Sequence, residues 1–131
     1  MARIKLLIDT DIFIDYLKGM SPAKVVFRSK DIDIYCSVLT KKELLNKPGL
    51  KDSERKKIVS IFRELKTILI DSDISIKYSD LLAKYHERGL QPSDAIIAAT
   101  AWSKKLPLLT RNRKHFTYIE EITLSPIYDQ S

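Results

Sequence analysis

Apolar positions along the chain alternate between two spacings, one typical of buried strands and one typical of amphipathic helices. Residues 3–8 form a short apolar run with β-branched side chains that stops at Asp9, which predicts a buried strand. Residues 52–66 place apolar side chains three or four positions apart, which predicts a helix with one apolar face. Further strands are predicted at 31–36, 67–70 and 107–110, with 121–124 as a candidate fifth, and further helices at 11–18, from 21 onward, 37–46, 73–88 and 92–104.

Alternating strands and helices predict an α/β fold. The chain has 131 residues, the length of one domain, and no repeat or linker divides it. We expect a single domain over residues 1–131, built on a mainly parallel sheet of four or five strands with helices on both faces. Binding sites in such sheets form outside the carboxyl ends of the strands, so polar side chains just after the strands are the candidates for chemistry.

The composition excludes several classes of protein. Apolar residues make up 44% of the chain, which indicates a globular protein rather than a disordered one. Its apolar runs are far shorter than the roughly 20 residues that span a bilayer. Cys36 is the only cysteine, so an internal disulfide and a zinc site of several cysteines are excluded, and its apolar neighbours predict a buried thiol. The first residues read as a strand rather than a signal peptide, so we expect a cytoplasmic location.

The net charge of +6 is concentrated in the first half of the chain. Residues 1–66 hold 15 Lys and Arg against 9 Asp and Glu, whereas residues 67–131 hold 8 of each kind. The densest basic stretch runs from residue 41 to 57. Such a stretch attracts polyanions, including nucleic acids, although an ordinary solvated helix face has the same composition.

Carboxylates stand where the predicted strands end or the helices begin. Asp9 comes directly after the first strand, and Asp11 follows two residues later. Glu43 lies about one turn into the helix that follows the second strand. Asp94 lies in the first turn of a helix that is apolar nearly all round, where the helix dipole favours its charge.

The fourth predicted strand is followed by Thr110 and Asn112, which offer a hydroxyl and an amide oxygen. Asn112 could also cap a short turn before His115 and Phe116. Together with the acids, these residues mean that four separate strand-to-helix connections deliver oxygen atoms to one edge of the sheet.

Each acid also has a purely structural interpretation. Asp9 or Asp11 could cap the first helix. Thr40 and Glu43 match a capping box, which would explain Glu43 without any chemistry. Asp94 could simply complement the helix terminus. The joint pattern is harder to explain in this way, because acids that face one crevice repel one another unless a cation is present.

A divalent cation is therefore the predicted cofactor. Ligands that are all oxygen select Mg²⁺ or Mn²⁺ over zinc. We expect Asp9 and Asp94 to bind the metal, which would polarise a phosphoryl oxygen and lower the pKa of a bound water. Glu43 could orient that water for in-line attack, and the choice between one ion and two stays open. Asp15, His86 and His115 are expected to be mainly structural.

Four segments of the chain resemble the motifs of PIN-domain ribonucleases, in the same order and spacing. They are residues 7–15 (LIDTDIFID), 38–44 (VLTKKEL), 93–101 (SDAIIAATA) and 108–116 (LLTRNRKHF), the third being the most specific. In its length and in having no extra domain, the chain resembles the VapC toxins of bacterial and archaeal toxin–antitoxin pairs.

This resemblance implies an endoribonuclease that depends on Mg²⁺ or Mn²⁺, with acids at Asp9, Glu43 and Asp94 and metal ligation chiefly on Asp9 and Asp94. It also implies an RNA substrate, a homodimer, and inhibition by a small antitoxin protein whose tail fills the acidic crevice. The fourth acidic position of the family falls on Asn112, whose amide carries no charge, so a second metal ion is less expected. Asp11 could compensate.

Two other functions are compatible with the same residues. The chain could be a PIN nuclease of RNA or DNA processing that is not a toxin. It could also be a catalytically silent module that binds nucleic acid, a hypothesis that Asn112 supports.

Overall fold

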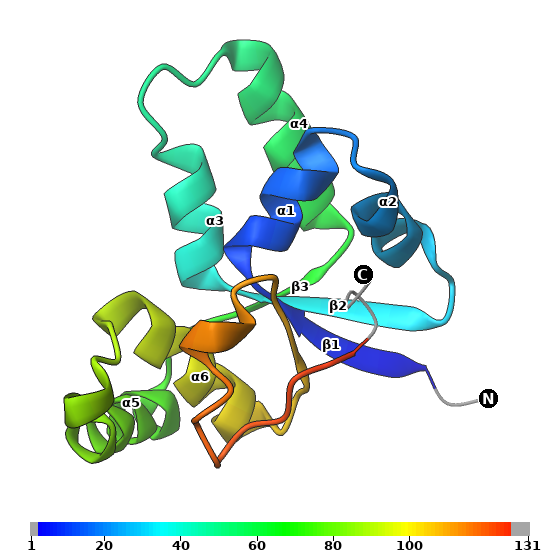
Figure 1. The fold of residues 1–131 in the computed structure, drawn as a ribbon. Helices are drawn as coiled ribbons and strands as arrows, with labels where there is room; N and C mark the ends of the chain where they lie inside the picture. The colour runs from blue at the N-terminus through cyan, green and yellow to red at the C-terminus, as the bar shows by residue number, and fades with distance from the viewer. Residues whose placement is uncertain (1–2, 127–131) are drawn as a thin grey trace.

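The computed structural model describes residues 3–126, in which helices and strands alternate as the sequence predicts (Figure 1). The strands are β1 Ile4–Ile8, β2 Ile32–Ser37, β3 Lys66–Ile68 and β4 Leu108–Leu109. The helices are α1 Thr10–Leu17, α2 Ser21–Arg28, α3 Val38–Leu45, α4 Asp52–Arg63, α5 Ser72–Lys84 and α6 Pro92–Lys104, with 3₁₀ turns η1 His86–Arg88 and η2 Arg113–His115. Within residues 3–126, no helix is both long and apolar enough to cross a membrane.

The four strands form one sheet in the order β3-β2-β1-β4, and each pairing between neighbouring strands is parallel. The predicted α/β class with a parallel sheet is therefore confirmed. The predicted fifth strand at 121–124 is wrong, because this segment contributes only an isolated parallel bridge between Leu124 and Leu108 in the described part of the chain. The strand order reverses at β1, since β2 and β3 extend the sheet on one side and β4 on the other.

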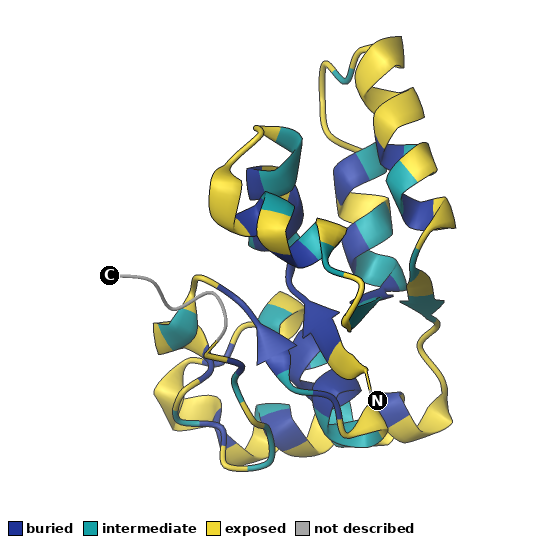
Figure 2. Cartoon of the chain, turned by 90° about the vertical axis from the view of Figure 1, so that its right-hand side faces the viewer, coloured by how far each residue is buried: buried dark blue, intermediate teal, exposed yellow. Residues whose placement is uncertain are grey.

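Helices cover both faces of the sheet, with α1 to α4 on one side and α5 and α6 on the other (Figure 1). Successive β1 side chains point to opposite faces. Leu6 and Ile8 pack into the core under α1 to α4, and Leu7 packs into the core under α5 and α6. The end of β1, the end of β2 and all of β4 are accordingly buried between two layers of half-exposed helices (Figure 2). Cys36 is fully buried, as predicted.

Two abrupt junctions between strand and helix position the site. Asp9 follows β1 directly and is the N-cap of α1, so its carboxylate accepts a hydrogen bond from the Thr10 backbone N–H. Ser37 ends β2 and caps α3 in the same way, through the Leu39 N–H. Both helices therefore begin at the carboxyl edge of the sheet and carry their first turns there.

Candidate active site

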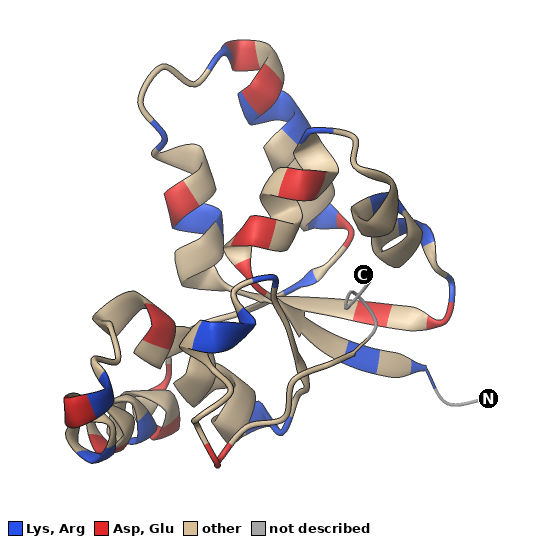
Figure 3. Ribbon diagram, viewed as in Figure 1, with Lys and Arg blue, Asp and Glu red and all other residues tan. Residues whose placement is uncertain are grey.

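The carboxylates that the sequence singles out meet at the carboxyl edge of the sheet, at the point where the strand order reverses. Asp9 and Asp11 come from the start of α1, Glu43 from α3 and Asp94 from the first turn of α6. Figure 3 shows acidic positions on α1 and α3 near the ends of the strands. A reversal of strand order leaves a crevice between the two outgoing connections, which is where open α/β sheets bind ligands.

These four acids line one open pocket of about 250 Å³. The remaining residues of its wall are Thr10, Ile14, Ser93, Ile97 and Asn112. The structure thus brings together the four predicted acids and Asn112, while Thr110 lies just behind them.

Asp9 is the most buried of the four acids. Its Oδ1 accepts a hydrogen bond from the Thr10 N–H at 2.8 Å, and its Oδ2 accepts one from the Thr110 hydroxyl at 2.8 Å. Burial, and after it the charge of Asp11, raises the pKa of Asp9 from 3.8 to about 6. The hydrogen bonds to Thr110 and Thr10 oppose this rise without cancelling it. Asp9 therefore caps α1, as one interpretation of the sequence held, and also faces the other acids.

Asp11 has one carboxylate oxygen engaged and one unpaired. Its Oδ2 accepts a hydrogen bond from the Arg111 backbone N–H at 3.0 Å. Its Oδ1 is buried and has no hydrogen-bond partner among the described residues. Burial raises the pKa of Asp11 above its usual value. A buried oxygen without a donor is costly, and a cation or a bound water in the pocket would satisfy it.

Asp94 is held by His115, which the sequence analysis expected to be mainly structural. The Oδ2 atom of Asp94 lies 3.1 Å from Nδ1 of His115, which belongs to η2. An ionised carboxylate only accepts hydrogen bonds, so Nδ1 must carry the hydrogen. The clue in the sequence was that His115 stands three residues after Asn112, in the connection that already supplied candidate residues.

Glu43 does not cap its helix, so the capping-box interpretation is wrong. The helix α3 begins at Val38 and is capped by Ser37, which leaves Thr40 and Glu43 inside it. The buried Thr40 hydroxyl instead lies 3.1 Å from the Thr10 hydroxyl and ties α3 to α1. Partial burial raises the pKa of Glu43, and the charge of Asp94 adds to the rise against a hydrogen bond from Thr10.

The segment after β4 supports the site rather than adding charge to it. Thr110 is buried and donates to Asp9, and its oxygen accepts a hydrogen bond from the Asn112 backbone N–H at 3.0 Å. The Asn112 side chain faces the pocket and makes no hydrogen bond within residues 3–126. Asp15 lies outside the pocket, where it is buried and pairs with the Arg111 guanidinium at 2.8 Å, which agrees with the structural role expected of it.

The donor set fits a hard cation that keeps part of its water shell. No three Asp, Glu, His or Cys side chains among residues 3–126 are close enough to form a ready-made metal cage. Mg²⁺ rarely uses such a cage, because it dehydrates reluctantly and takes one or two carboxylates with several waters. The buried, unpaired Asp11 oxygen and the mutual effect of the acids on their pKa values are the features that such an ion would relieve.

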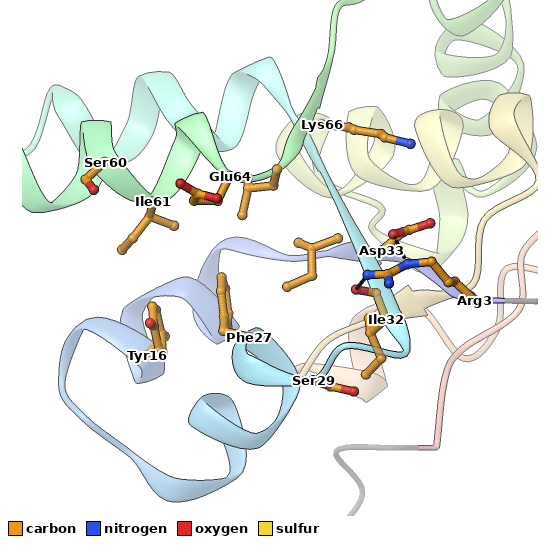
Figure 4. Close-up of a pocket in the computed structure, with 12 residues that line it drawn as sticks. Arg3, Tyr16, Phe27, Ser29, Ile32, Asp33, Ser60, Ile61, Glu64 and Lys66 are labelled. Carbon is orange, nitrogen blue, oxygen red and sulfur yellow. Dashed lines mark hydrogen bonds and ion pairs between the residues drawn. The ribbon is translucent and has the colours of Figure 1, made fainter.

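A larger hollow of about 380 Å³ lies at the opposite edge of the sheet, between α2 and α4 and the beginnings of β1 and β2 (Figure 4). Its wall includes an ion pair between Arg3 and Asp33 and a stacked pair of rings, Tyr16 and Phe27. None of the acids predicted from the sequence lines it. The acidic pocket is therefore the candidate active site.

A parallel sheet whose strand order reverses beside a pocket of four carboxylates defines a class of α/β protein with an acidic site at the switch point. The particular family follows from comparison with known sequences. The model of the PIN domain family matches residues 6–121, and the chain belongs to that family.

Relatives cover nearly the whole chain. Ribonuclease VapC1 of Methanocaldococcus jannaschii is 33% identical over 129 residues, which cover 96% of this chain and 88% of the relative. Ribonuclease VapC19 of Mycobacterium tuberculosis is 34% identical over 122 residues, which cover 88% of this chain and 95% of the relative. The expected resemblance to VapC proteins is confirmed.

Solved structures agree. A toxin–antitoxin complex from Klebsiella pneumoniae contains a chain with a TM-score of 0.78 and 30% identity, covering 92% of this chain and 97% of that one. A chain in the structure of VapBC2 from Rickettsia felis, bound to a DNA fragment from their promoter, has a TM-score of 0.81 at 20% identity. That alignment covers 93% of this chain and 98% of the other, and it shows the shared fold.

Proposed function

We propose that this chain is a VapC-type endoribonuclease, the toxin of a toxin–antitoxin pair, and that it hydrolyses RNA phosphodiester bonds with the help of Mg²⁺ or Mn²⁺. The observation that carries the proposal is the pocket that gathers Asp9, Asp11, Glu43 and Asp94 at the switch point of the sheet. Membership of the PIN family and the names of the ribonuclease relatives support the choice of RNA.

Asp9 and Asp94 are the proposed metal ligands, since both carboxylates face the pocket and each is held by a hydrogen-bond donor. The bound ion would polarise a phosphoryl oxygen and lower the pKa of its water. Glu43, which lines the same pocket from α3, would orient the attacking water and accept its proton, a role that suits a carboxyl with a raised pKa. Asn112 would contribute a neutral hydrogen bond to water or phosphate.

Metal-dependent cleavage tests this proposal. Purified protein incubated with a structured RNA should cleave it in Mn²⁺ and not in EDTA. Asp94→Asn should lower the rate at least about 100-fold, because it removes a charged ligand without changing the volume of the side chain. Asp80→Asn is the matched control, since Asp80 is an exposed acid on α5 outside the pocket.

The outcomes separate the competing functions. Equal cleavage by wild type and Asp94→Asn would exclude the acidic pocket as the catalytic site. A wild-type protein that neither cleaves RNA nor binds Mn²⁺ in calorimetry would instead be a silent binding module. Cleavage of DNA in preference to RNA would indicate a processing nuclease.

We also propose a small antitoxin protein as the partner, because the structural neighbours include VapBC and other toxin–antitoxin complexes. Expression of the chain alone should arrest growth, and co-expression of the protein encoded by a short adjacent reading frame should restore it. Growth that is unaffected by a chain shown to cleave RNA would favour a housekeeping nuclease. A homodimer is the proposed assembly, and light scattering should give twice the 15.1 kDa mass of one chain.

A further inference from the structure

A second hollow adjoins the acidic pocket and shares part of its wall. It has a volume of about 390 Å³ and lies between α1, α3 and α4. Thr10, Ile14 and Glu43 line both hollows, so the two are continuous around these side chains. Anything that occupies the acidic pocket and extends beyond it on this side enters the second hollow.

The inner wall of the second hollow is apolar. Leu44 of α3 and Ile58 of α4 are buried there, with Leu17 of α1 half-buried beside them. Ile14, at the boundary between the two hollows, keeps 37% of its surface exposed. An isoleucine exposed beside four carboxylates is unusual for a site that handles only ions, and it offers a flat apolar contact to a ligand.

The outer rim is basic. Lys18 from the end of α1 and Lys47 after α3 both line the hollow and are exposed. Neither ammonium group has a carboxylate within 4 Å in the described part of the chain. The acid on this rim, Glu54, accepts a hydrogen bond from the Lys51 backbone N–H at 3.3 Å. Two unpaired cations over an apolar floor match a ligand with anionic and flat apolar parts.

We propose that this second hollow binds the nucleoside next to the scissile phosphate of a single-stranded RNA. The base lies against Ile14 and the apolar floor, and the phosphates that flank it contact Lys18 and Lys47. Apolar side chains serve as stacking surfaces for unpaired bases, and lysines track the backbone. The inference rests on the proposed ribonuclease function and adds to it the part of the chain that reads the substrate.

Abasic scanning tests the contact with the base. A set of RNA oligonucleotides, each lacking one base near the cut, is cleaved in Mn²⁺ by wild type and by Ile14→Ala. Loss of one particular base beside the cut should lower the wild-type kcat/KM about 5- to 140-fold, the range of a lost stacking contact. The same loss should cost Ile14→Ala less than about 3-fold, because its contact is already absent. Ile14 is exposed, so the fold should tolerate this change.

Lysine variants test the contacts with the phosphates. Lys47→Ala should raise KM with little change in kcat. It should also make the negative slope of log kcat/KM against log salt less steep by about 0.7, because one phosphate contact is lost. Lys30→Ala is the matched control, because Lys30 is an exposed lysine in the connection between α2 and β2, outside the hollow and outside the basic stretch 41–57, and this change should leave both KM and the salt slope unchanged.

The inference and the proposed function fail in different ways. If wild type cleaves RNA but Ile14→Ala is as sensitive to every abasic site as wild type is, the inference is wrong and the function stands. If both variants cleave like wild type but need more partner protein for inhibition, the hollow belongs to a protein partner and the inference is again wrong. If wild type cleaves no RNA, both fall together.

Discussion

Asp9 carries a conflict between stability and function in a single side chain. In the unfolded chain its pKa is near the ordinary value, whereas in the folded protein burial and the charge of Asp11 raise it to about 6. A raised pKa means that the fold favours the neutral carboxyl, so its contribution to stability is present at low pH and is lost as pH rises through 6. Under the proposed function, the charge that the fold disfavours at Asp9 is the one that would bind the metal ion.

The stability of the metal-free protein should therefore fall with rising pH in a way that depends on Asp9. Between pH 4.5 and 7 the contribution of this carboxyl should fall by about 2 kcal/mol, as a rise in pKa of about two units requires. Urea unfolding in EDTA measures it. Asp9→Asn keeps an N-cap and removes the charge, so the unfolding free energy of this variant should not include the fall. Its stability relative to wild type should therefore rise by about 2 kcal/mol between pH 4.5 and pH 7. Parallel pH profiles of the two proteins would contradict the prediction.

His115 should act through Asp94. Its Nδ1–H holds the Asp94 carboxylate at 3.1 Å, and donors behind a metal ligand typically contribute 10- to 100-fold in affinity. We expect His115→Ala to weaken Mn²⁺ binding about 10-fold in calorimetry. His115→Gln, which keeps an N–H donor, should recover part of the loss. His86→Ala, in exposed η1, is the control and should bind as wild type does. Unchanged affinity of His115→Ala would show that the contact does not position Asp94.

The sequence could predict that Asp9, Asp11 and Glu43 come together, because each follows the end of a strand and a parallel sheet brings those ends together. Asp94 joins them from the first turn of α6, which follows η1 rather than a strand. The sequence could not predict how these acids are held. The Thr40 capping box was plausible by spacing, yet Ser37 is closer to the strand end and caps the helix instead. The contact of His115 with Asp94 depends on how η2 packs over the first turn of α6, a tertiary relation that neither local spacing nor periodicity encodes.

At the scale of elements, the segment from β4 to η2 contacts three of the four acids in the pocket. Thr110 bonds Asp9, the Arg111 backbone bonds Asp11, and His115 bonds Asp94. Like charges at one edge repel, so the positions of these three acids depend in part on donors from this connection, beside the Thr10 N–H that also bonds Asp9. This segment therefore belongs to the candidate site through its hydrogen-bond donors, although Asn112 stands where the family usually has a fourth acid.

The side chain of Arg111 should anchor this segment. Its Nε lies 2.8 Å from the Asp15 carboxylate, which is 3% exposed, whereas the arginine is 51% exposed. Because solvent screens half of the pair, we expect Arg111→Ala to cost about 1–2 kcal/mol of unfolding free energy rather than the larger cost of a fully buried pair. Lys114→Ala, an exposed neighbour, should be neutral in the same urea titration. If Arg111→Ala and Lys114→Ala are equally stable, the ion pair between Arg111 and Asp15 does not contribute to the stability of the fold.

Long elements with strong periodicity were predictable, and short ones at the sheet edge were not. The helix predicted at 92–104 has those bounds as α6, whereas the one predicted at 73–88 breaks at Tyr85 into α5 and η1. The third strand ends at Ile68 rather than at residue 70, and Leu69 is 70% exposed. An edge strand has one neighbour, so its length depends on where that neighbour ends, which the strand's own residues do not encode.

At the scale of the whole molecule, the protein has a positive net charge, whereas its candidate active site is lined by acids. The net charge is +6, yet the pocket that is proposed to meet an RNA phosphate is lined by four acids. Cations elsewhere must then bring the polyanion to the pocket, and the stretch from 41 to 57 lies on α3, α4 and the connection between them, on one side of it. The sequence alone left open whether this stretch binds nucleic acid or is merely solvated.

Salt dependence of cleavage should decide that question. If about three phosphates of a single strand are neutralised by lysines and arginines, log kcat/KM should fall with log salt at a slope near −2. Raising monovalent salt from 50 to 200 mM at constant Mn²⁺ should then lower kcat/KM about 16-fold. A dinucleotide substrate is the control, because it offers one phosphate and should lose only about threefold. A long RNA whose cleavage is as insensitive to salt as that of the dinucleotide would show that the basic stretch is a solvated surface and that the substrate is held by the pocket alone.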